Sequence, residues 1–283
     1  MKRCDGTRGI LNPLDGFARF SLERYAPSTD LAPFVERYWV VRWALDEAER
    51  FEQQILPNPC VNLAFEPGRS AVHGIGTRRF VAQLEGRGRV VGIKFRPGCF
   101  LAFASRPMDT LVDRVVPLAE AFDLDVPELE RQVLGAEDDR ASIPVVESFL
   151  RSQKHSCVDP AFELVARLVE LTQHDRSIAR AAQLAHHASI SVRSLHRLFE
   201  KYMGLGPKWV IRRSRVQDAA ERVATGAKLD WACLARELGY HDQAHLIHDF
   251  KEQVGFTPAV YAARCAQAAR VETGSRERAE VTG

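Results

Sequence analysis

Long apolar runs are missing from this chain of 283 residues, and their absence excludes one class of protein at once. No stretch approaches the roughly 18 consecutive apolar residues of a membrane-spanning helix. The opening segment, Met1-Lys-Arg-Cys-Asp, leads into no apolar region, so the sequence predicts no secretory signal and a cytoplasmic location. An apolar content of 46% still suffices for ordinary buried cores, and the length favours about two domains.

Cysteine is sparse, and its six copies are scattered along the chain. No two of them form a Cys-x-x-Cys pair, so neither a disulfide framework nor a cysteine zinc site is indicated. A reduced compartment fits this usage. Cys60 and Cys99 fall in the N-terminal half, where a reactive thiol would sense oxidants, although cysteine is more commonly a small buried residue. The full set is Cys4, Cys60, Cys99, Cys157, Cys233 and Cys265.

Catalytic motifs are also missing. The segment His241-Asp-Gln-Ala-His245 has nearly the zinc-protease spacing, but Asp242 stands where that motif requires Glu. If Asp242 caps a helix, His241 lies outside the helix and shares no face with His245. The run Gly86-Arg-Gly-Arg-Val-Val-Gly92 has the wrong spacing for a dinucleotide loop and favours a hairpin turn. We therefore expect no catalytic residues, no metal site, no cofactor and no enzyme activity.

A large net charge of one sign is absent overall, because the formal net charge is only +2. The charge is unevenly distributed, however. Residues 1–155 have a net charge of −1, whereas residues 174–264 have a net charge of +5 and contain seven of the nine histidines. A basic region attracts phosphate groups, and its affinity for them falls with salt. A solvated basic surface would have the same composition, so charge alone leaves nucleic-acid binding open.

The N-terminal half contains short apolar or alternating runs that are separated by turn residues, a pattern typical of strands. Such runs are residues 18–24, 38–45, 51–56, 60–65, 71–75, 79–84 and 89–95. The gaps are too short for parallel crossovers, so we expect an antiparallel sandwich or small barrel. Its aromatic residues either form the core or line an effector pocket; they are Tyr38, Trp39, Trp43, Phe65, Phe80 and Phe95.

From about Pro97 onward the apolar period becomes that of helices. The predicted helices are residues 99–104, 108–112, 118–122, 127–134 and 143–153. Beyond a polar boundary near residues 154–160, Asp159 is predicted to cap a further helix with Pro160 at its first position.

The last third of the chain contains one helical unit twice, offset by 51 positions. A capping residue, two apolar anchors, a Gly and a Pro recur in register. They are Ser191, Leu195, Phe199, Gly204 and Pro207 in the first copy, and Asp242, Leu246, Phe250, Gly255 and Pro258 in the second. Each copy follows a shorter helix-like stretch. Both copies therefore predict a helix-turn-helix, a motif that usually places its second helix in a DNA groove.

The outward faces of the two second helices carry hydrogen-bonding side chains suited to base edges. In the first unit these candidates are Arg193, Ser194, His196 and Arg197; in the second they are Gln243, His245 and His248. Ala244 offers only an apolar contact. Four basic residues are predicted to contact the DNA backbone: Lys201, Lys208, Arg212 and Lys251.

Residues 207–226 join the two units, and they begin with Pro and end with Gly as a capped helix does. About 18 residues of helix rise by roughly 27 Å, whereas successive major-groove segments on one side of DNA lie about 34 Å apart. A single rigid helix of this length can present both units to adjacent turns.

The stretch Leu234–Tyr261 resembles the signature of AraC/XylS-type transcriptional regulators, and the likeness extends over about residues 178–264. The resemblance implies a DNA-binding domain of seven helices. It assigns base reading to Arg193, His196, Arg197, Gln243 and His248. The chain departs from the pattern at residues 186–190, which lack the usual Gly, and at His248, where Arg or Lys is frequent.

The N-terminal half is similar to an uncharacterised domain found ahead of some AraC-type modules. The likeness rests on Pro59-Cys-Val-Asn-Leu and on Gly92-Ile-Lys-Phe-Arg-Pro-Gly. This second resemblance implies no particular ligand.

We therefore predict an α+β chain with three parts. Residues 1–155 form an antiparallel β-rich domain with a helical end, which senses an effector or dimerises. Residues 156–266 form an all-α double helix-turn-helix, and residues 267–283 lack periodicity and form a disordered tail. The predicted function is sequence-specific binding of double-stranded DNA to regulate transcription, with most of the specificity in the first unit.

Several partners and alternatives stay open at this point. A small-molecule effector and RNA polymerase are further candidate partners, and both a monomer and a homodimer fit. Two rival functions are an N-terminal enzyme or receptor with accessory helices, and a protein-binding helical module. The first lacks a catalytic motif in residues 1–150, and the second would need apolar residues at the outward positions.

Overall fold

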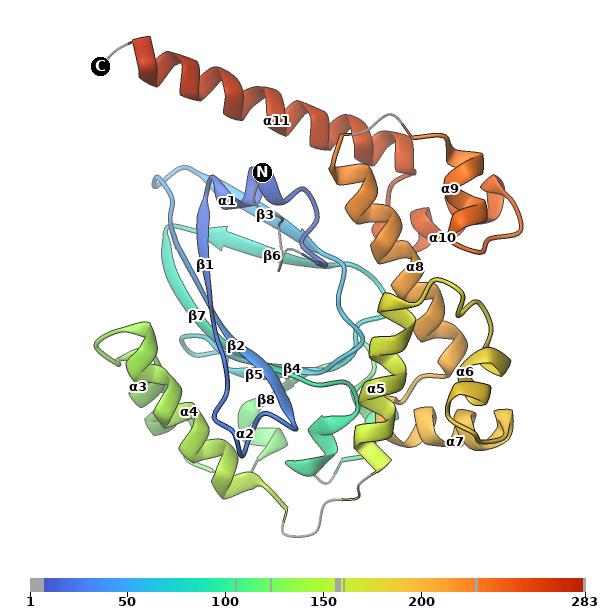
Figure 1. The fold of residues 1–283 in the computed structure, drawn as a ribbon. Helices are drawn as coiled ribbons and strands as arrows, with labels where there is room; N and C mark the ends of the chain where they lie inside the picture. The colour runs from blue at the N-terminus through green and yellow to red at the C-terminus, as the bar shows by residue number, and fades with distance from the viewer. Residues whose placement is uncertain are drawn as a thin grey trace.

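The structure is a computed structural model that describes residues 8–104, 106–122, 124–155, 159, 161–226 and 229–281, with side chains as far as residue 270. Cys4, Cys157 and the predicted first helical residue Pro160 lie outside the described residues. Within them, no helix combines the length and the apolar character that crossing a bilayer requires. The chain has the predicted α+β class, with strands in the N-terminal half and helices in the C-terminal half (Figure 1).

Two antiparallel sheets make up the N-terminal half. The larger has the order β1-β2-β7-β4-β5-β8, and the smaller pairs β3 with β6. Figure 1 shows the larger sheet curving so that β3 and β6 lie across from β4 and β5. The strands are β1 (Phe20–Tyr25), β2 (Val35–Ala44), β3 (Arg50–Ile55), β4 (Asn62–Phe65), β5 (Ala71–His73), β6 (Phe80–Glu85), β7 (Arg87–Phe95) and β8 (Val115–Pro117).

Alternation along β2 decides which side chains enter the core. Tyr38 and Val40 are buried on one face. Trp39 lies on the other face, directly opposite Gly92 of β7, where an added Cβ atom would come within 2.0 Å of the indole ring. Glycine in β7 therefore makes room for the tryptophan, which explains a glycine inside a strand.

The turn at Gly86 differs from the hairpin that we expected. Gly86 has a φ of 53° and joins β6 to β7, but these strands pair in different sheets. The turn is therefore a corner between sheets, and the glycine supplies the left-handed backbone that it needs.

Several short elements accompany the sheets. The first two of the five segments predicted as helices after residue 97 are single 3-10 turns, η1 (Cys99–Ala102) and η2 (Met108–Leu111). The strand β8 and the helix α1 (Pro13–Phe17) were not predicted, because elements of three to five residues are too short to show a period. The remaining N-terminal helices are α2 (Leu118–Ala121), α3 (Val126–Leu134) and α4 (Asp139–Gln153).

Seven helices follow in the C-terminal part of the described chain, as the family resemblance implied. They are α5 (Ala161–His174), α6 (Ala181–His187), α7 (Val192–Met203), α8 (Pro207–Ala224), α9 (Trp231–Glu237), α10 (Gln243–Val254) and α11 (Pro258–Val281). α11 continues as far as Val281, within the segment that we expected to be a disordered tail. The helix was missed because we looked for an apolar stripe, which indicates packing. Ala, Arg and Glu favour a helix by their intrinsic propensity, even where no apolar stripe is present.

Two apolar clusters hold these elements together. The first, which we name the shared core, is not divided near residue 155. It includes Tyr38, Phe95 and Met108 from the N-terminal half and Phe162, Phe199 and Val210 from the helices. The second, the distal core, includes Val216, Leu234, Leu246, Phe250 and Tyr261 together with Leu11 and Leu56. The expected boundary at residue 155 is therefore not a boundary between cores.

Candidate nucleic-acid interface

The first helix-turn-helix consists of α6 and α7. Ser191 caps α7, since its hydroxyl accepts a hydrogen bond from the Ser194 amide at 3.0 Å. Ile190, just before the cap, is half-buried against the shared core that contains Leu195. These two apolar residues hold the entry to α7 as a hydrophobic staple does. The two predicted apolar anchors, Leu195 and Phe199, are buried, and Tyr202 near the end of α7 is buried with them.

The second unit, α9 and α10, repeats the design with a longer turn. Asp242 caps α10 by accepting a hydrogen bond from the His245 amide at 2.8 Å. α10 begins 51 residues after α7, as the sequence repeat predicted, but α9 begins only 50 residues after α6. The turn of the second unit is therefore one residue longer.

The two turns also differ in the residue that takes the left-handed backbone. In the second unit it is Gly239, with a φ of 69°. In the first it is Ser189, with a φ of 53°. The Gly that the first turn lacks is therefore replaced by a serine in a conformation that costs about 1–2 kcal/mol for an ordinary side chain.

The base-reading candidates of α7 reach solvent. Arg193, Ser194 and Arg197 are exposed, and His196 is half-buried. Neither arginine has a hydrogen bond or an ion pair with any described residue. The Ser194 hydroxyl lies 2.9 Å from the Ser191 hydroxyl, so one hydrogen bond of Ser194 is already formed with the capping residue.

On α10 the candidates are less free. Gln243, His245 and His248 are exposed, as is Ala244. Nε2 of His245 lies 3.8 Å from the Asp249 carboxylate one turn later. The second unit therefore offers fewer uncommitted donors than the first.

Arg212, predicted as a DNA-backbone contact, is only partly exposed and binds carboxylates of the protein itself. Its Nε and Nη2 atoms donate to the two carboxylate oxygens of Asp249 at 3.0 and 2.7 Å, and Nη2 also reaches Glu252 at 2.8 Å. Asp249 is almost completely buried. The hydrogen bonds to Asp249 raise the pKa of Arg212. This bidentate pair fastens α10 to α8, which makes Arg212 a positioning residue for α10.

The other three predicted backbone contacts divide in the same way. Lys201 at the end of α7 donates to Asp159 at 2.8 Å. Lys208 at the start of α8 and Lys251 near the end of α10 are exposed and form no ion pair within the described chain. Lys208 and Lys251 are therefore the lysines most available to phosphate.

Both reading helices, as we name α7 and α10, end against the N-terminal half. A Cβ atom at Gly204, which follows α7, would lie 2.6 Å from the carbonyl oxygen of Met108 in η2. After α10, Arg79 donates to the carbonyl oxygen of Val254 at 3.1 Å and stacks over the Phe256 ring. The N-terminal half thus contacts the C-terminal end of each reading helix.

The N-terminal half also contacts the linker helix α8. Arg213 is fully buried, and its Nη2 donates to the carbonyl oxygens of Gly76 and Thr77 at 3.1 and 2.5 Å. Burial lowers the pKa of Arg213 to about 10. Its guanidinium lies over the Trp209 ring, 5.0 Å from the ring centroid. We did not predict these contacts from sequence, since an arginine in a basic helix gives no signal that it is buried.

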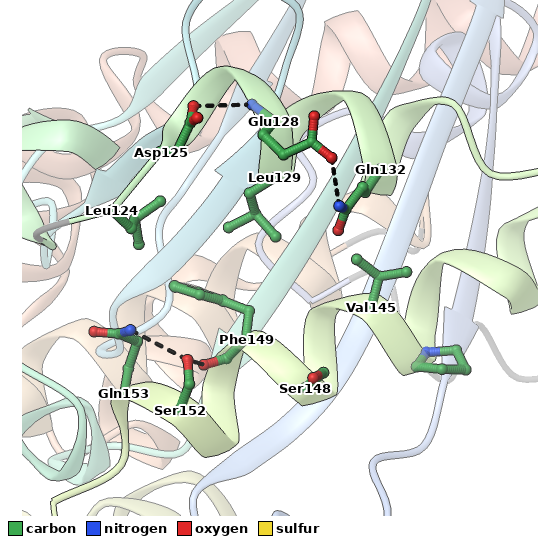
Figure 2. A pocket seen from close by; sticks show the side chains of 11 residues that line it. Leu124, Asp125, Glu128, Leu129, Gln132, Val145, Ser148, Phe149, Ser152 and Gln153 are labelled. Atoms are coloured by element: carbon green, nitrogen blue, oxygen red, sulfur yellow. Dashed lines mark hydrogen bonds between the residues drawn. The ribbon is translucent and has the colours of Figure 1, made fainter.

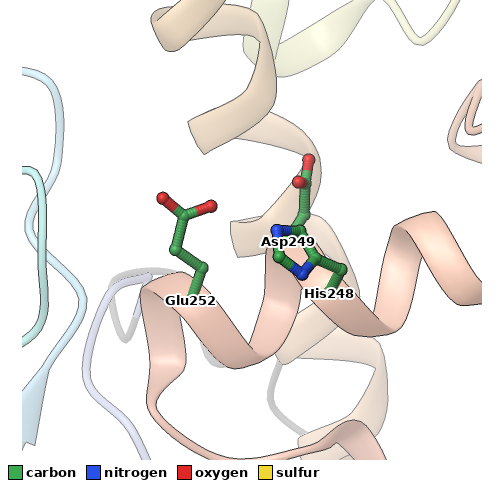
Figure 3. A group of neighbouring side chains, drawn as sticks. All are labelled: His248, Asp249 and Glu252. Atoms are coloured by element: carbon green, nitrogen blue, oxygen red, sulfur yellow. The ribbon is translucent and has the colours of Figure 1, made fainter.

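Figure 3 shows three side chains of α10, His248, Asp249 and Glu252, whose potential ligand atoms lie within 4.8 Å of one another. This spacing would suit a metal ion. However, the Arg212 guanidinium already binds both carboxylates and offsets one of their two negative charges. The group is therefore explained by the contact between α8 and α10.

Two grooves open on the N-terminal side. One, of about 540 Å³, lies between α3 and α4 and has an apolar wall that includes Leu124, Leu129 and Phe149 (Figure 2). The other, of about 680 Å³, joins both halves of the molecule: its walls include Leu101 of η1, Met108 of η2, Phe162 of α5 and Tyr202 of α7. The second groove thus touches a reading helix.

The aromatic and cysteine residues of the N-terminal half serve mainly as core. Tyr38, Phe65 and Phe95 are fully buried in the shared core, whereas Phe80 is exposed. Burial raises the pKa of the Cys60 thiol to about 11 and that of Cys99 to about 12. Both remain protonated near neutral pH, so the reactive thiolate that an oxidant sensor needs is scarce.

Comparison with protein families gives two separate matches along the chain. Residues 184–264 match a family described as a helix-turn-helix domain, which is of the AraC type. Residues 23–117 match a family described as a domain of unknown function, DUF6597. The comparison with curated protein sequences gave no match.

The solved structures to which the chain is similar include a transcriptional regulator, ToxT and a DNA-binding domain. A transcriptional regulator from Chromobacterium violaceum, described as having an AraC-type DNA-binding domain, is 21% identical, with 35% of this chain and 89% of that chain covered and a TM-score of 0.33. ToxT from Vibrio cholerae is 12% identical, with 87% and 98% covered and a TM-score of 0.41. The DNA-binding domain of AdpA, solved with a target DNA, is 29% identical, with 40% and 96% covered and a TM-score of 0.32.

Proposed function

Since residues 184–264 are a helix-turn-helix domain of the AraC type, the chain is a DNA-binding transcription regulator, and we propose that α7 and α10 read adjacent segments of the major groove. The proposal has the chain act by binding DNA rather than by catalysis. A regulator of this kind works where the DNA is, so the cytoplasmic location remains part of the proposal.

The observation that carries the proposal is the pair of reading helices on one linker. Both begin at a side-chain cap and both leave their first turn exposed. The linker helix α8 has 18 residues, a rise of roughly 27 Å, and both of its ends pack into apolar cores. Rigid spacing of this order lets one chain contact two successive turns of DNA.

The side chains assign unequal roles to the two helices. Arg193 and Arg197 present free guanidinium groups, which suit the O6 and N7 acceptors of guanine. α10 presents Gln243, which suits adenine, and His248. The two half-sites therefore differ, and the first carries most of the specificity. Lys208 and Lys251 fit contacts to phosphate.

The N-terminal half fits the role of a regulatory domain. An effector in the groove that joins η1 and η2 to α7 would act on a reading helix directly. We keep a small-molecule effector, contact with RNA polymerase and dimerisation through this half as parts of the proposal. A monomer already has two reading helices, so dimerisation is not required for binding.

Selection of DNA sites from a random pool with the full chain tests the proposal. The expected product is a bipartite motif whose halves lie about one helical turn apart, with stronger base preference in one half. If no sequence is enriched over the starting pool, the proposed function is wrong.

A further inference from the structure

Val192 is the first residue of α7, and its side chain is 42% exposed. It is one of six large apolar side chains that are exposed among the described residues. A single exposed valine is ordinary on a protein surface. Its meaning therefore depends on what surrounds it.

Val192 contributes neither to the cap of α7 nor to either apolar core. The capping hydrogen bond at the start of α7 comes from Ser191. The apolar support of the same turn comes from Ile190, which packs against the core that contains Leu195. Val192 belongs to neither the shared core nor the distal core. The fold of the first turn is thus complete without it.

Val192 lies among the base-reading candidates. It precedes Arg193 directly and lies one helical turn before His196, so the two side chains share a face. The 51-residue repeat places it in register with Gln243, the first residue of α10. Sequence reasoning missed this residue because it selected hydrogen-bonding side chains only, although the register pointed to it.

We propose that Val192 is a specificity-determining residue that contacts the 5-methyl group of a thymine in the first half-site. In the major groove, thymine presents an apolar group and the other bases of unmodified DNA present only donors and acceptors. An exposed apolar side chain gains from contact with that methyl group. This inference rests on the proposed function, because it requires α7 to lie in the major groove.

Replacement of thymine by deoxyuridine tests the contact, since uracil lacks only the methyl group. The site obtained by selection is resynthesised with one deoxyuridine at a time, and the affinity of the full chain is measured for each duplex. One position in the first half-site is expected to weaken binding by about fourfold, the effect of one buried methyl group.

The variant Val192→Ser connects the effect to this residue. Serine has one hydroxyl group where valine has two methyl groups, so the variant loses the apolar surface. The same deoxyuridine should therefore change the affinity of the variant by less than about 1.5-fold, roughly the error of the measurement. Val115→Ser is the matched control, because Val115 is also an exposed valine, 56% exposed, but lies on β8. This control should retain the full fourfold sensitivity.

Two results overturn the inference and leave the proposed function standing. One is a selected site in which no thymine of the first half-site responds to deoxyuridine. The other is a Val192→Ser variant that keeps the fourfold response. Failure of the proposed function looks different, because then no site is enriched by selection.

Discussion

The two helix-turn-helix units share a scaffold but are fastened to the rest of the molecule differently. α6 and α7 pack into the shared core, which extends from the sheet of the N-terminal half. α9 and α10 pack into the distal core, and the Arg212–Asp249 ion pair ties α10 to α8. At the position that corresponds to Asp249, α7 has Leu198, which packs against the shared core. The first unit is thus held by apolar burial and the second partly by charge.

This difference bears on recognition as well as stability. The polar contacts that position α10 use Arg212 and draw on His245, whereas α7 keeps Arg193 and Arg197 free. When apolar contacts position a reading helix, its polar side chains remain available to bind DNA. We expect the first unit to dominate both folding and base discrimination.

The largest expected difference in stability between the two units comes from replacing Phe199 and Phe250, which occupy matched positions. Phe199→Ala and Phe250→Ala should each cost about 3–5 kcal/mol, because both rings are fully buried. Phe199→Ala should lower the melting temperature of the whole chain, whereas Phe250→Ala should mainly unfold α9 and α10. Amide hydrogen exchange distinguishes unfolding of the whole chain from local unfolding of α9 and α10. If both variants accelerate exchange at the same amides, the two cores unfold together.

Breaking the ion pair on α10 should have the next largest effect. Arg212→Met leaves the buried Asp249 carboxylate without its partner and should destabilise the chain by roughly 2 kcal/mol, below the value for a fully buried pair because Arg212 is partly exposed. Binding to the second half-site should weaken with it. Denaturant unfolding measures the first effect and duplexes mutated in one half-site measure the second.

Lys208→Met is the matched control, since it removes a cation from the same helix where the structure shows no ion pair. It should leave the free energy of unfolding unchanged within about 0.5 kcal/mol. If Lys208→Met and Arg212→Met change the free energy of unfolding by the same amount, Arg212 does not position α10.

Matched truncations on the reading helices test the assignment of specificity. Arg197→Ala should remove about 1–3 kcal/mol of discrimination at particular base pairs of the first half-site. His248→Ala, at the corresponding position of α10, should remove less than half as much in the second half-site. Binding to a panel of single-base variants of the selected site gives both numbers, and a larger loss for His248→Ala would reverse the comparison.

Salt dependence separates the lysines at the ends of the reading helices. Lys251→Ala should reduce the slope of log affinity against log salt by about one, with equal weakening on all sequences. Lys201→Ala should change the slope less, because Asp159 already holds the Lys201 ammonium group. Equal changes in slope would show that the Lys201–Asp159 pair opens when DNA binds.

The smallest expected effect is in the turns. Ser189→Gly should stabilise the chain by about 0.5 kcal/mol, because glycine adopts the left-handed backbone without strain and loses part of the gain as unfolded-state entropy. Gly239→Ser should destabilise it by about 1 kcal/mol, since a Cβ atom there also approaches Arg215 at 3.1 Å. Thermal unfolding of both variants checks the signs, and a loss of stability in Ser189→Gly would contradict the strain at Ser189.

The reading helices could be predicted from sequence because caps, apolar stripes and terminal glycines are local signals. Ser191, Leu195 and Gly204 lie within one helix length of each other, so their spacing alone defines α7. The same locality explains why most strands of the N-terminal half were found at nearly their observed bounds.

Contacts between distant segments could not be predicted. Arg212 looked like any other basic residue, and only the folded chain brings Asp249 to it across 37 positions. The same holds for Arg213 and the carbonyl of Gly76, which lie 137 positions apart. An apolar stripe tells that a helix face is buried, but not which partner covers it, so the shared core was also missed.

The shared core has a consequence for the order in which this chain folds during synthesis. The N-terminal sheet leaves the ribosome first and offers the apolar surface that Phe162 and Phe199 later cover. The distal core needs Tyr261 near the start of α11 as well as Leu11 and Leu56. It closes only when nearly the whole nascent chain has emerged, so termination between α7 and α10 would yield a sheet with one reading helix and no second.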